Sequence, residues 1–168
     1  TNENFQSKNL GPELTARGVT TSERVKHIYD VGGALGGPLM KDKMWFYFTY
    51  KYEDFKTYVP SSTFSDGSRA FRQSMGSYSA VTRLTYQASS RDKIRFYLDR
   101  QFNGEDYNGF NTLPTTTPEA STDAFGLGWV PQVKWTQTTT NKLLLDAGLS
   151  YYTQYYEQQC RDSVAPTD

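Results

Sequence analysis

The feature that most constrains this chain is a two-residue alternation of apolar and polar residues, which recurs in six segments. It is clearest in residues 94–101, IRFYLDRQ in one-letter code, where the even positions through Leu98 are apolar. Neighbouring side chains of a strand point to opposite faces, so each segment predicts a strand with one apolar and one polar face. The sequence therefore predicts an all-β protein built from antiparallel β-hairpins. Its apolar face turns inward in a soluble sandwich and outward to lipid in a membrane barrel.

The lengths of the predicted strands favour the membrane barrel. The six strands are expected at residues 25–35, 44–55, 77–87, 94–101, 124–135 and 142–156. Several of them exceed the roughly 9–11 residues that a tilted strand needs to cross the hydrocarbon. A strand of a globular sandwich averages about five or six residues.

The connections between these strands are expected to alternate in length. Short turns are predicted at residues 36–43, 89–93 and 137–141, and long loops at residues 56–74 and 102–123. Bacterial outer-membrane barrels have short periplasmic turns and long extracellular loops. The alternation therefore agrees with the strand lengths.

Composition excludes some classes of protein and leaves others open. The 18 basic and 18 acidic residues cancel, which argues against a nucleic-acid partner. No apolar run approaches the length of a membrane-spanning helix, and the mean hydropathy is −0.70. The aromatic content of 15% suits the aromatic girdles of a membrane barrel, but it equally suits a carbohydrate-binding sandwich.

Three residues depart from the strand pattern. Pro131 lies inside the fifth predicted strand, where it cannot donate a backbone hydrogen bond, so we expect a β-bulge there. Ile28 and Leu144 are apolar residues on predicted polar faces.

The two ends of the chain suggest a piece of a longer protein. The N-terminus has no starting Met and no signal peptide, and the C-terminus lacks a final strand. The single cysteine, Cys160, cannot form an internal disulfide, and its role is not assigned.

The candidate catalytic residues fit a structural role better than a chemical one. His27 is the single histidine and is expected on the lipid-facing or interfacial side, as an ordinary strand residue. Glu53 and Asp54 are adjacent on a strand, so their carboxylates point to opposite faces and cannot cooperate as a glycosidase pair. The carboxylates of Glu105 and Asp106 are expected to be solvated in a polar loop.

Other motifs also fail to indicate a catalytic or cofactor site. The pairs Gly32–Gly33 and Gly36–Gly37 are not followed by the Lys-Ser/Thr and helix of a phosphate-binding loop, so we expect them to relax a turn. Residues 102–110 mix aromatic, amide and acidic side chains, which suits either contact with a sugar or peptide or an ordinary surface loop. We therefore predict no enzymatic activity, no cofactor and no metal ion, and we assign no substrate-binding residue.

The charged residues of the six strands are expected on the polar faces. They form a wall of mixed sign whose charges pair across strands, or a wall that meets another part of the protein. These residues are Lys26, Asp30, Lys51, Glu53, Arg83, Arg95, Asp99, Lys134 and Asp146.

Four stretches carry a resemblance to a known family. Residues 32–48, GGALGGPLMKDKMWFYF, resemble the "GGP…KDKLFFF" hairpin of TonB-dependent outer-membrane receptors, most closely the Oar-like group with a carboxypeptidase-regulatory-like domain. Residues 10–18 resemble the loop before that hairpin. Residues 83–87 with 92–94 resemble the next hairpin, and residues 135–136 with 141–148 the one after. The four stretches cover most of the chain in the family's order.

The resemblance implies that residues 1–168 are part of a transmembrane β-barrel of about 22 strands, without the plug and the remaining barrel. The expected location is the bacterial outer membrane. The expected partners are membrane lipid, the rest of the barrel and its plug, and the TonB complex through that plug. Such a receptor takes up or binds a large nutrient, whose identity the resemblance does not give.

Two other functions stay open at this point. The first is a soluble, secreted β-sandwich that binds carbohydrate, which requires short strands in two stacked sheets. The second is an outer-membrane barrel that serves adhesion or surface assembly.

Overall fold

The computed structural model describes residues 3–7, 10–19, 22–109 and 117–161. These residues form one antiparallel sheet of eight strands. Three short helices, η1 (Glu3–Phe5), α1 (Pro12–Ala16) and η2 (Pro118–Ala120), lie outside the sheet. None of the helices in the described ranges is long and apolar enough to cross a bilayer. The strands are β1 (Arg24–Met40), β2 (Met44–Thr63), β3 (Arg69–Ser74), β4 (Ser77–Gln87), β5 (Asp92–Asn108), β6 (Thr122–Thr140), β7 (Leu143–Ser150) and β8 (Thr153–Cys160).

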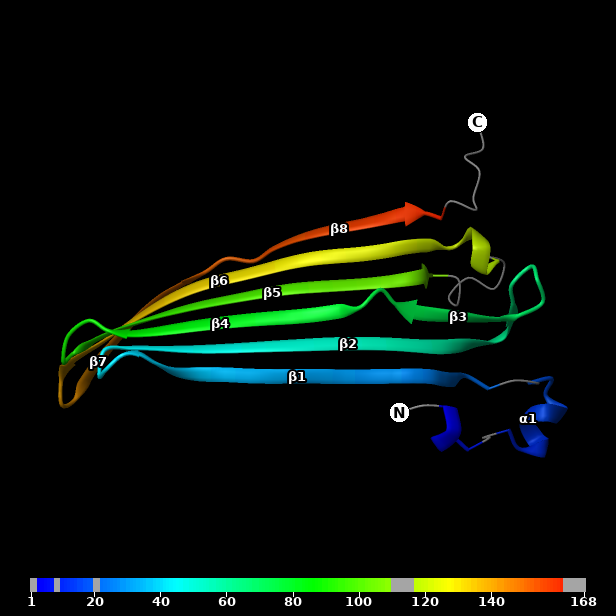
Figure 1. Cartoon of the computed structure of the whole chain (residues 1–168), viewed down its shortest axis with the longest axis horizontal. Helices are drawn as coiled ribbons and strands as arrows, with labels where there is room; N and C mark the ends of the chain where they lie inside the picture. Colours follow the sequence, from blue (N-terminus) through cyan, green and yellow to red (C-terminus); the bar gives the residue numbers. More distant parts are fainter. Residues whose placement is uncertain (1–2, 8–9, 20–21, 110–116, 162–168) are drawn as a thin grey trace.

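The eight strands lie along six lines in the sheet (Figure 1). β3 and β4 follow one another between β2 and β5, and β7 and β8 follow one another beside β6. β1 forms one edge, and β7 with β8 forms the other. Each line pairs with the next line along the chain, so the sheet is a simple meander.

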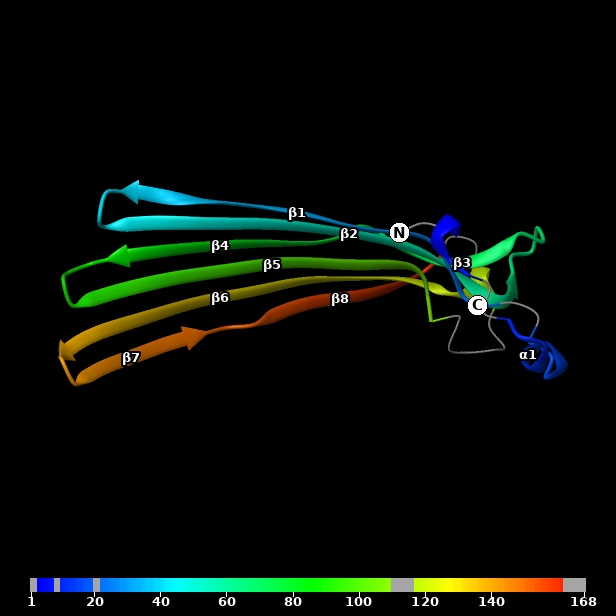
Figure 2. The same cartoon turned by 90° about the horizontal axis from the view of Figure 1, so that it is seen from below.

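The three tight turns lie together at one end of the sheet, as Figure 2 shows. They join β1 to β2, β4 to β5 and β6 to β7. We call this the turn end, and the opposite end, which carries α1, η2 and β3, the loop end. Asp42, in the first turn, has a φ of 58°, a left-handed conformation that Asp tolerates better than most residues.

The prediction of an all-β antiparallel fold is confirmed, but several predicted connections are wrong. β1 continues through Gly36, Gly37 and Pro38 to Met40, so only residues 41–43 form the turn. Gly36 pairs with Tyr47 on β2. The Tyr47 ring occupies the space that a side chain at position 36 would need, so a glycine fits this position of the strand. The glycines therefore belong to a strand and not to a relaxed turn.

The two predicted long loops are largely strand. Residues 56–63 extend β2 and residues 69–74 form β3, with a short turn between them. Residues 102–108 extend β5, which pairs there with β3 and with β6. Polar side chains that pair across the strands stabilise these extensions, so the hydrophobic alternation did not reveal them.

The expected β-bulge at Pro131 is absent. Pro131 pairs with Leu98 on β5 without any shift of register. The missing proline amide instead faces the other neighbour, where β7 ends at Ser150 and β8 begins at Thr153. The single predicted strand 142–156 is therefore two strands. A bulge does occur at Met75–Gly76, between β3 and β4, where Gly76 has a φ of 85°.

The sheet has almost no core of its own. Among the described residues, the buried apolar side chains are those of Ala70, Ala124 and Pro118, and no large side chain is fully buried. Phe96 is 49% exposed and Leu149 is 73% exposed. No second sheet covers the apolar face in the described part of the chain, whereas a sandwich buries such a face between two sheets.

Candidate functional site

Strand register sorts the side chains of the sheet into two faces. Because neighbouring residues alternate, every second residue of each line joins its register partners on one face. One of these faces, the apolar face, consists of rows that run across the sheet. Five consecutive rows, from the turn end toward the loop end, are Met44–Tyr86–Ile94–Trp135–Ala147, Gly37–Phe46–Leu84–Phe96–Val133–Leu149, Leu35–Phe48–Thr82–Leu98–Pro131–Tyr151, Gly33–Tyr50–Ala80–Arg100–Trp129–Thr153 and Val31–Tyr52–Tyr78–Phe102–Leu127–Tyr155.

Apart from Tyr151 in the third row, the Tyr and Trp residues of the five rows gather at two levels of the apolar face. Tyr86 and Trp135 lie in the row nearest the turn end. Tyr50 and Trp129 lie three rows further, followed by the row of Tyr78. About 27 Å of strand separates Tyr78 from Tyr86, which corresponds to a height of about 20 Å at a tilt of about 40°. The apolar band of outer-membrane barrels is about 25 Å tall and lies between two such levels.

The opposite face, the polar face, carries charges that pair with one another. Lys51 contacts Asp30 at 3.4 Å and also Glu53. Asp99 is buried and accepts a 3.0 Å hydrogen bond from the Ser79 hydroxyl. Lys134 on β6 pairs with Asp146 on β7 at 3.1 Å. The expected wall of mixed, cross-strand charge is therefore present on this face.

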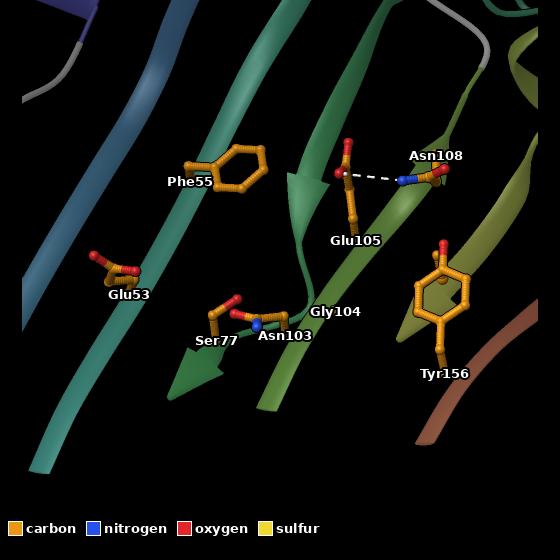
Figure 3. Close-up of a pocket in the computed structure, with 9 residues that line it drawn as sticks. Glu53, Phe55, Ser77, Asn103, Gly104, Glu105, Asn108 and Tyr156 are labelled. Carbon is orange, nitrogen blue, oxygen red and sulfur yellow. Dashed lines mark hydrogen bonds between the residues drawn. The ribbon is translucent and has the colours of Figure 1, made fainter. Parts of the chain in front are cut away.

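A polar groove lies on the polar face near the loop end (Figure 3). It combines a cavity of about 330 Å³ with a second one of about 210 Å³, which shares Glu53, Ser77 and Asn103 with the first. β2, β4, β5, β6 and β8 all contribute to its lining. The first cavity is lined by Glu53, Phe55, Ser77, Asn103, Gly104, Glu105, Asn108, Ala124 and Tyr156.

The carboxylates of the polar groove are held by partners within the sheet. Glu105 forms an ion pair with Arg72 on β3 and accepts a 3.3 Å hydrogen bond from the Asn108 amide. The Glu53 carboxylate accepts a hydrogen bond from Lys51. The groove therefore offers amide and hydroxyl groups, neutralised carboxylates and the rings of Phe55 and Tyr156. This set of groups suits hydrogen bonding to a polar ligand and contains no nucleophile with an adjacent base.

The structure separates the predicted candidate residues. The His27 Nε2 lies 3.0 Å from the Asp54 carboxylate, and the His27 ring stacks on Tyr29. Asp54 belongs to the apolar side of β2, while its neighbour Glu53 lies in the polar groove. Within the described residues, no group of three His, Cys, Asp or Glu side chains could hold a metal ion. Cys160 is exposed at the end of β8.

The expectation of a solvated Glu105–Asp106 pair in a loop is wrong. Both residues belong to β5 and are partly buried. Glu105 points into the polar groove, whereas the Asp106 carboxylate accepts a 2.5 Å hydrogen bond from the Gln73 side chain. Of the mixed stretch 102–110, Phe110 lies outside the described residues.

Sequence reasoning missed Tyr156 as a groove residue and Arg72 as the ion-pair partner of Glu105. Arg72 fell in a predicted loop, and its partner Glu105 is 33 residues away. Tyr156 was predicted as the end of the sixth strand without a role. The alternation of Arg72 and Ser74 with Phe71 and Gln73 was the one local signal for β3.

A second cluster of contacts lies at the loop end, beyond the aromatic rows. The rings of Phe64, Phe71 and Tyr107 meet edge to face with centroids 5.1–5.2 Å apart. Arg161 lies 3.8 Å over the Tyr107 ring and pairs with Asp123. This cluster fixes the turn after β2 against β5, so the loop end is ordered by side-chain packing.

Two carboxylates stabilise the adjoining loops. The hydroxyl and backbone N–H of Ser68 hydrogen-bond Asp66 and lower the pKa of that carboxyl below its usual value. The backbone N–H of Ser65 donates to Glu119 and lowers the pKa of that residue. The second bond ties the β2–β3 turn to η2.

Comparison of the chain with models of known protein families, with curated proteins and with solved structures finds no match.

Proposed function

We propose that the chain is a wall segment of a TonB-dependent outer-membrane receptor, a large β-barrel that takes up or binds a large nutrient. The observation that carries the proposal is the apolar face. It presents exposed aliphatic and aromatic side chains across six lines of strand, with aromatic levels at a spacing that suits a bilayer. An exposed apolar surface of this extent marks a site of contact with another apolar phase. Hydrocarbon is that phase in this proposal.

The two edges of the sheet support a larger barrel. Among the described residues, no strand pairs with the outer side of β1 or of the β7–β8 line, so both lines present sheet-edge backbone groups. A barrel satisfies such groups by closing the sheet, and no other arrangement of strands removes its edges in a membrane. In the proposed receptor, further strands of the same barrel pair with both edges. Residues 32–48, which resemble the receptor hairpin, cover the end of β1, the first turn and the start of β2. The resemblance therefore falls on a hairpin of the sheet.

The polar face has the role of the barrel lumen in this proposal. Its internally paired charges and its groove suit contact with a plug and with a solute that passes along the wall. The protein is then not an enzyme, and its mechanism is the energised movement of a plug within a closed wall. A carbohydrate-binding sandwich would need a second sheet over the apolar face.

The proposal is tested on the full-length protein that contains these residues. We expect it in the outer-membrane fraction, with the heat-modifiable mobility on gels of a closed barrel. We expect cells to accumulate its nutrient only when TonB is present. Recovery as a soluble monomer without detergent would contradict the barrel. Binding with no TonB-dependent accumulation would support the adhesion alternative and contradict uptake.

A further inference from the structure

Arg100 is the one charged side chain in the five rows of the apolar face. It is exposed, and its guanidinium carbon lies 4.8 Å from the Trp129 ring. Among the described residues, no carboxylate lies within ion-pair distance of Arg100. The nearest acidic residues of this face, Asp54 and Glu157, bond to His27 and to Gln159. Arg100 is therefore a cation without an anion in five rows that carry no other charge.

Two short side chains lie beside Arg100 on β4. Ala80 separates Tyr50 from Arg100 in the same row, and Thr82 follows Ala80 on β4 toward the turn end. Larger side chains flank this short pair on both neighbouring strands, because Phe48 and Leu98 lie on either side of Thr82. Arg100 and Tyr50 thus flank Ala80 in one row, with the Arg100 guanidinium over the Trp129 ring and the Tyr50 ring stacked on Tyr78.

The level of Arg100 is consistent with a membrane interface. An arginine on the lipid face costs about 2–4 kcal/mol at the bilayer midplane and about 0–1 kcal/mol near the headgroups. Arg100 lies in the same row as Tyr50 and Trp129, at the loop-end aromatic level. Aromatic residues of this kind sit at the depth of lipid headgroups. The Trp129 ring holds the guanidinium against the wall through a cation–π contact.

We propose that Arg100, at the level of Tyr50 and Trp129, binds the phosphate of an anionic membrane lipid. This inference rests on the proposed function, since it requires the apolar face to contact lipid. The planar guanidinium presents paired N–H donors that match two phosphate oxygens. The short side chains of Ala80 and Thr82 leave room for the start of an acyl chain along β4.

The test compares two arginines of the same strand on opposite faces. Arg95 lies on β5 on the polar face, so Arg95→Gln removes the same charge from the side away from lipid. The full-length protein and the variants Arg100→Gln, Arg100→Lys and Arg95→Gln are placed in nanodiscs of phosphatidylglycerol or phosphatidylcholine. Lipid that stays bound after transfer to detergent is counted by native mass spectrometry, and heat-modifiable mobility reports insertion separately.

We expect the wild type and Arg95→Gln to retain phosphatidylglycerol in preference to phosphatidylcholine. Arg100→Gln should lower the retention of phosphatidylglycerol about fivefold, the effect of one basic residue at a charged lipid surface. Arg100→Lys should keep part of it, because a lysine retains the charge but not the paired donors.

Equal retention by Arg100→Gln and Arg95→Gln in properly inserted protein would overturn this inference and leave the barrel proposal intact. Failure of the wild type to insert into either nanodisc would overturn both. Loss of the preference in Arg95→Gln with retention in Arg100→Gln would place the lipid on the other face, and would also overturn the inference.

Discussion

The backbone N–H of Tyr151 donates to the carbonyl of Pro131 at 3.0 Å, and the return bond is missing because proline has no N–H. In an antiparallel sheet, residues of a hydrogen-bonded pair exchange both bonds. The carbonyl of Tyr151 thus loses its strand partner, and the strand beside β6 is interrupted between β7 and β8. One missing amide on β6 therefore divides the strand next to it.

Replacing Pro131 with a residue that has a backbone N–H should restore the missing hydrogen bond. We expect Pro131→Val to donate to the Tyr151 carbonyl and to raise the free energy of unfolding by about 0.5–1.5 kcal/mol. Hydrogen exchange followed by mass spectrometry should show slower exchange at residues 150–153. Unchanged exchange there, with the variant correctly folded, would show that Pro131 does not cause the interruption.

The strand pattern was predictable from sequence wherever one face is apolar. Strands form in all six predicted segments, although the sixth segment is divided into β7 and β8. Phe46, Leu84 and Phe96 lie in register on one face, because hydrophobic alternation reports directly on sheet faces. β3 and the end of β5 were missed, because the residues that pair there, such as Arg72 on β3 and Glu105 on β5, are polar. The polar groove was missed for the same reason, since pairing over 33 residues of sequence leaves no local pattern.

Two glycines of β1 should respond differently to an added methyl group. A Cβ at Gly36 would lie 2.9 Å from the Tyr47 ring and 3.1 Å from the Phe46 carbonyl, while a Cβ at Gly33 would meet nothing within 4 Å. We expect Gly36→Ala to lower the free energy of unfolding by about 1–3 kcal/mol. Gly33→Ala should be neutral or stabilising by up to about 1 kcal/mol. Denaturant unfolding in detergent compares them, and equal effects would contradict the close fit of Tyr47.

The ion pair of the polar groove should contribute more to stability than an exposed pair. The Arg72 and Glu105 side chains are 27% and 20% exposed, whereas Arg17 and Glu13 of α1 are 71% and 79% exposed. We expect Glu105→Gln to lower the free energy of unfolding by about 1–3 kcal/mol, because it leaves a partly buried guanidinium without its charged partner. Glu13→Gln is the matched control and should lower the free energy of unfolding by less than about 0.5 kcal/mol. A Glu105→Gln effect no larger than that of the control would refute this account of the groove.

The contact between η2 and the β2–β3 turn should depend on acid pH. Folding lowers the pKa of Glu119, so its contribution to stability is present above the ordinary carboxyl pKa and is lost as the pH falls through the lowered value. Hydrogen-exchange protection of the Ser65 amide should be constant from pH 7 to about pH 5 and should fall only below about pH 4. Glu119→Gln should abolish this dependence. A transition centred above about pH 5 would contradict the assignment to Glu119.

The most direct test of the central claim compares two neighbouring residues of β5. Phe96 lies on the apolar face and Tyr97 on the polar face. In a Cys160→Ser background of the full-length protein, Phe96→Cys and Tyr97→Cys are each labelled with a nitroxide in lipid vesicles. Accessibility to oxygen and to a water-soluble nickel chelate is then measured by electron paramagnetic resonance. The account predicts oxygen access without nickel access at position 96, and no such lipid exposure at position 97. Nickel access or a fully buried label at position 96 would contradict it.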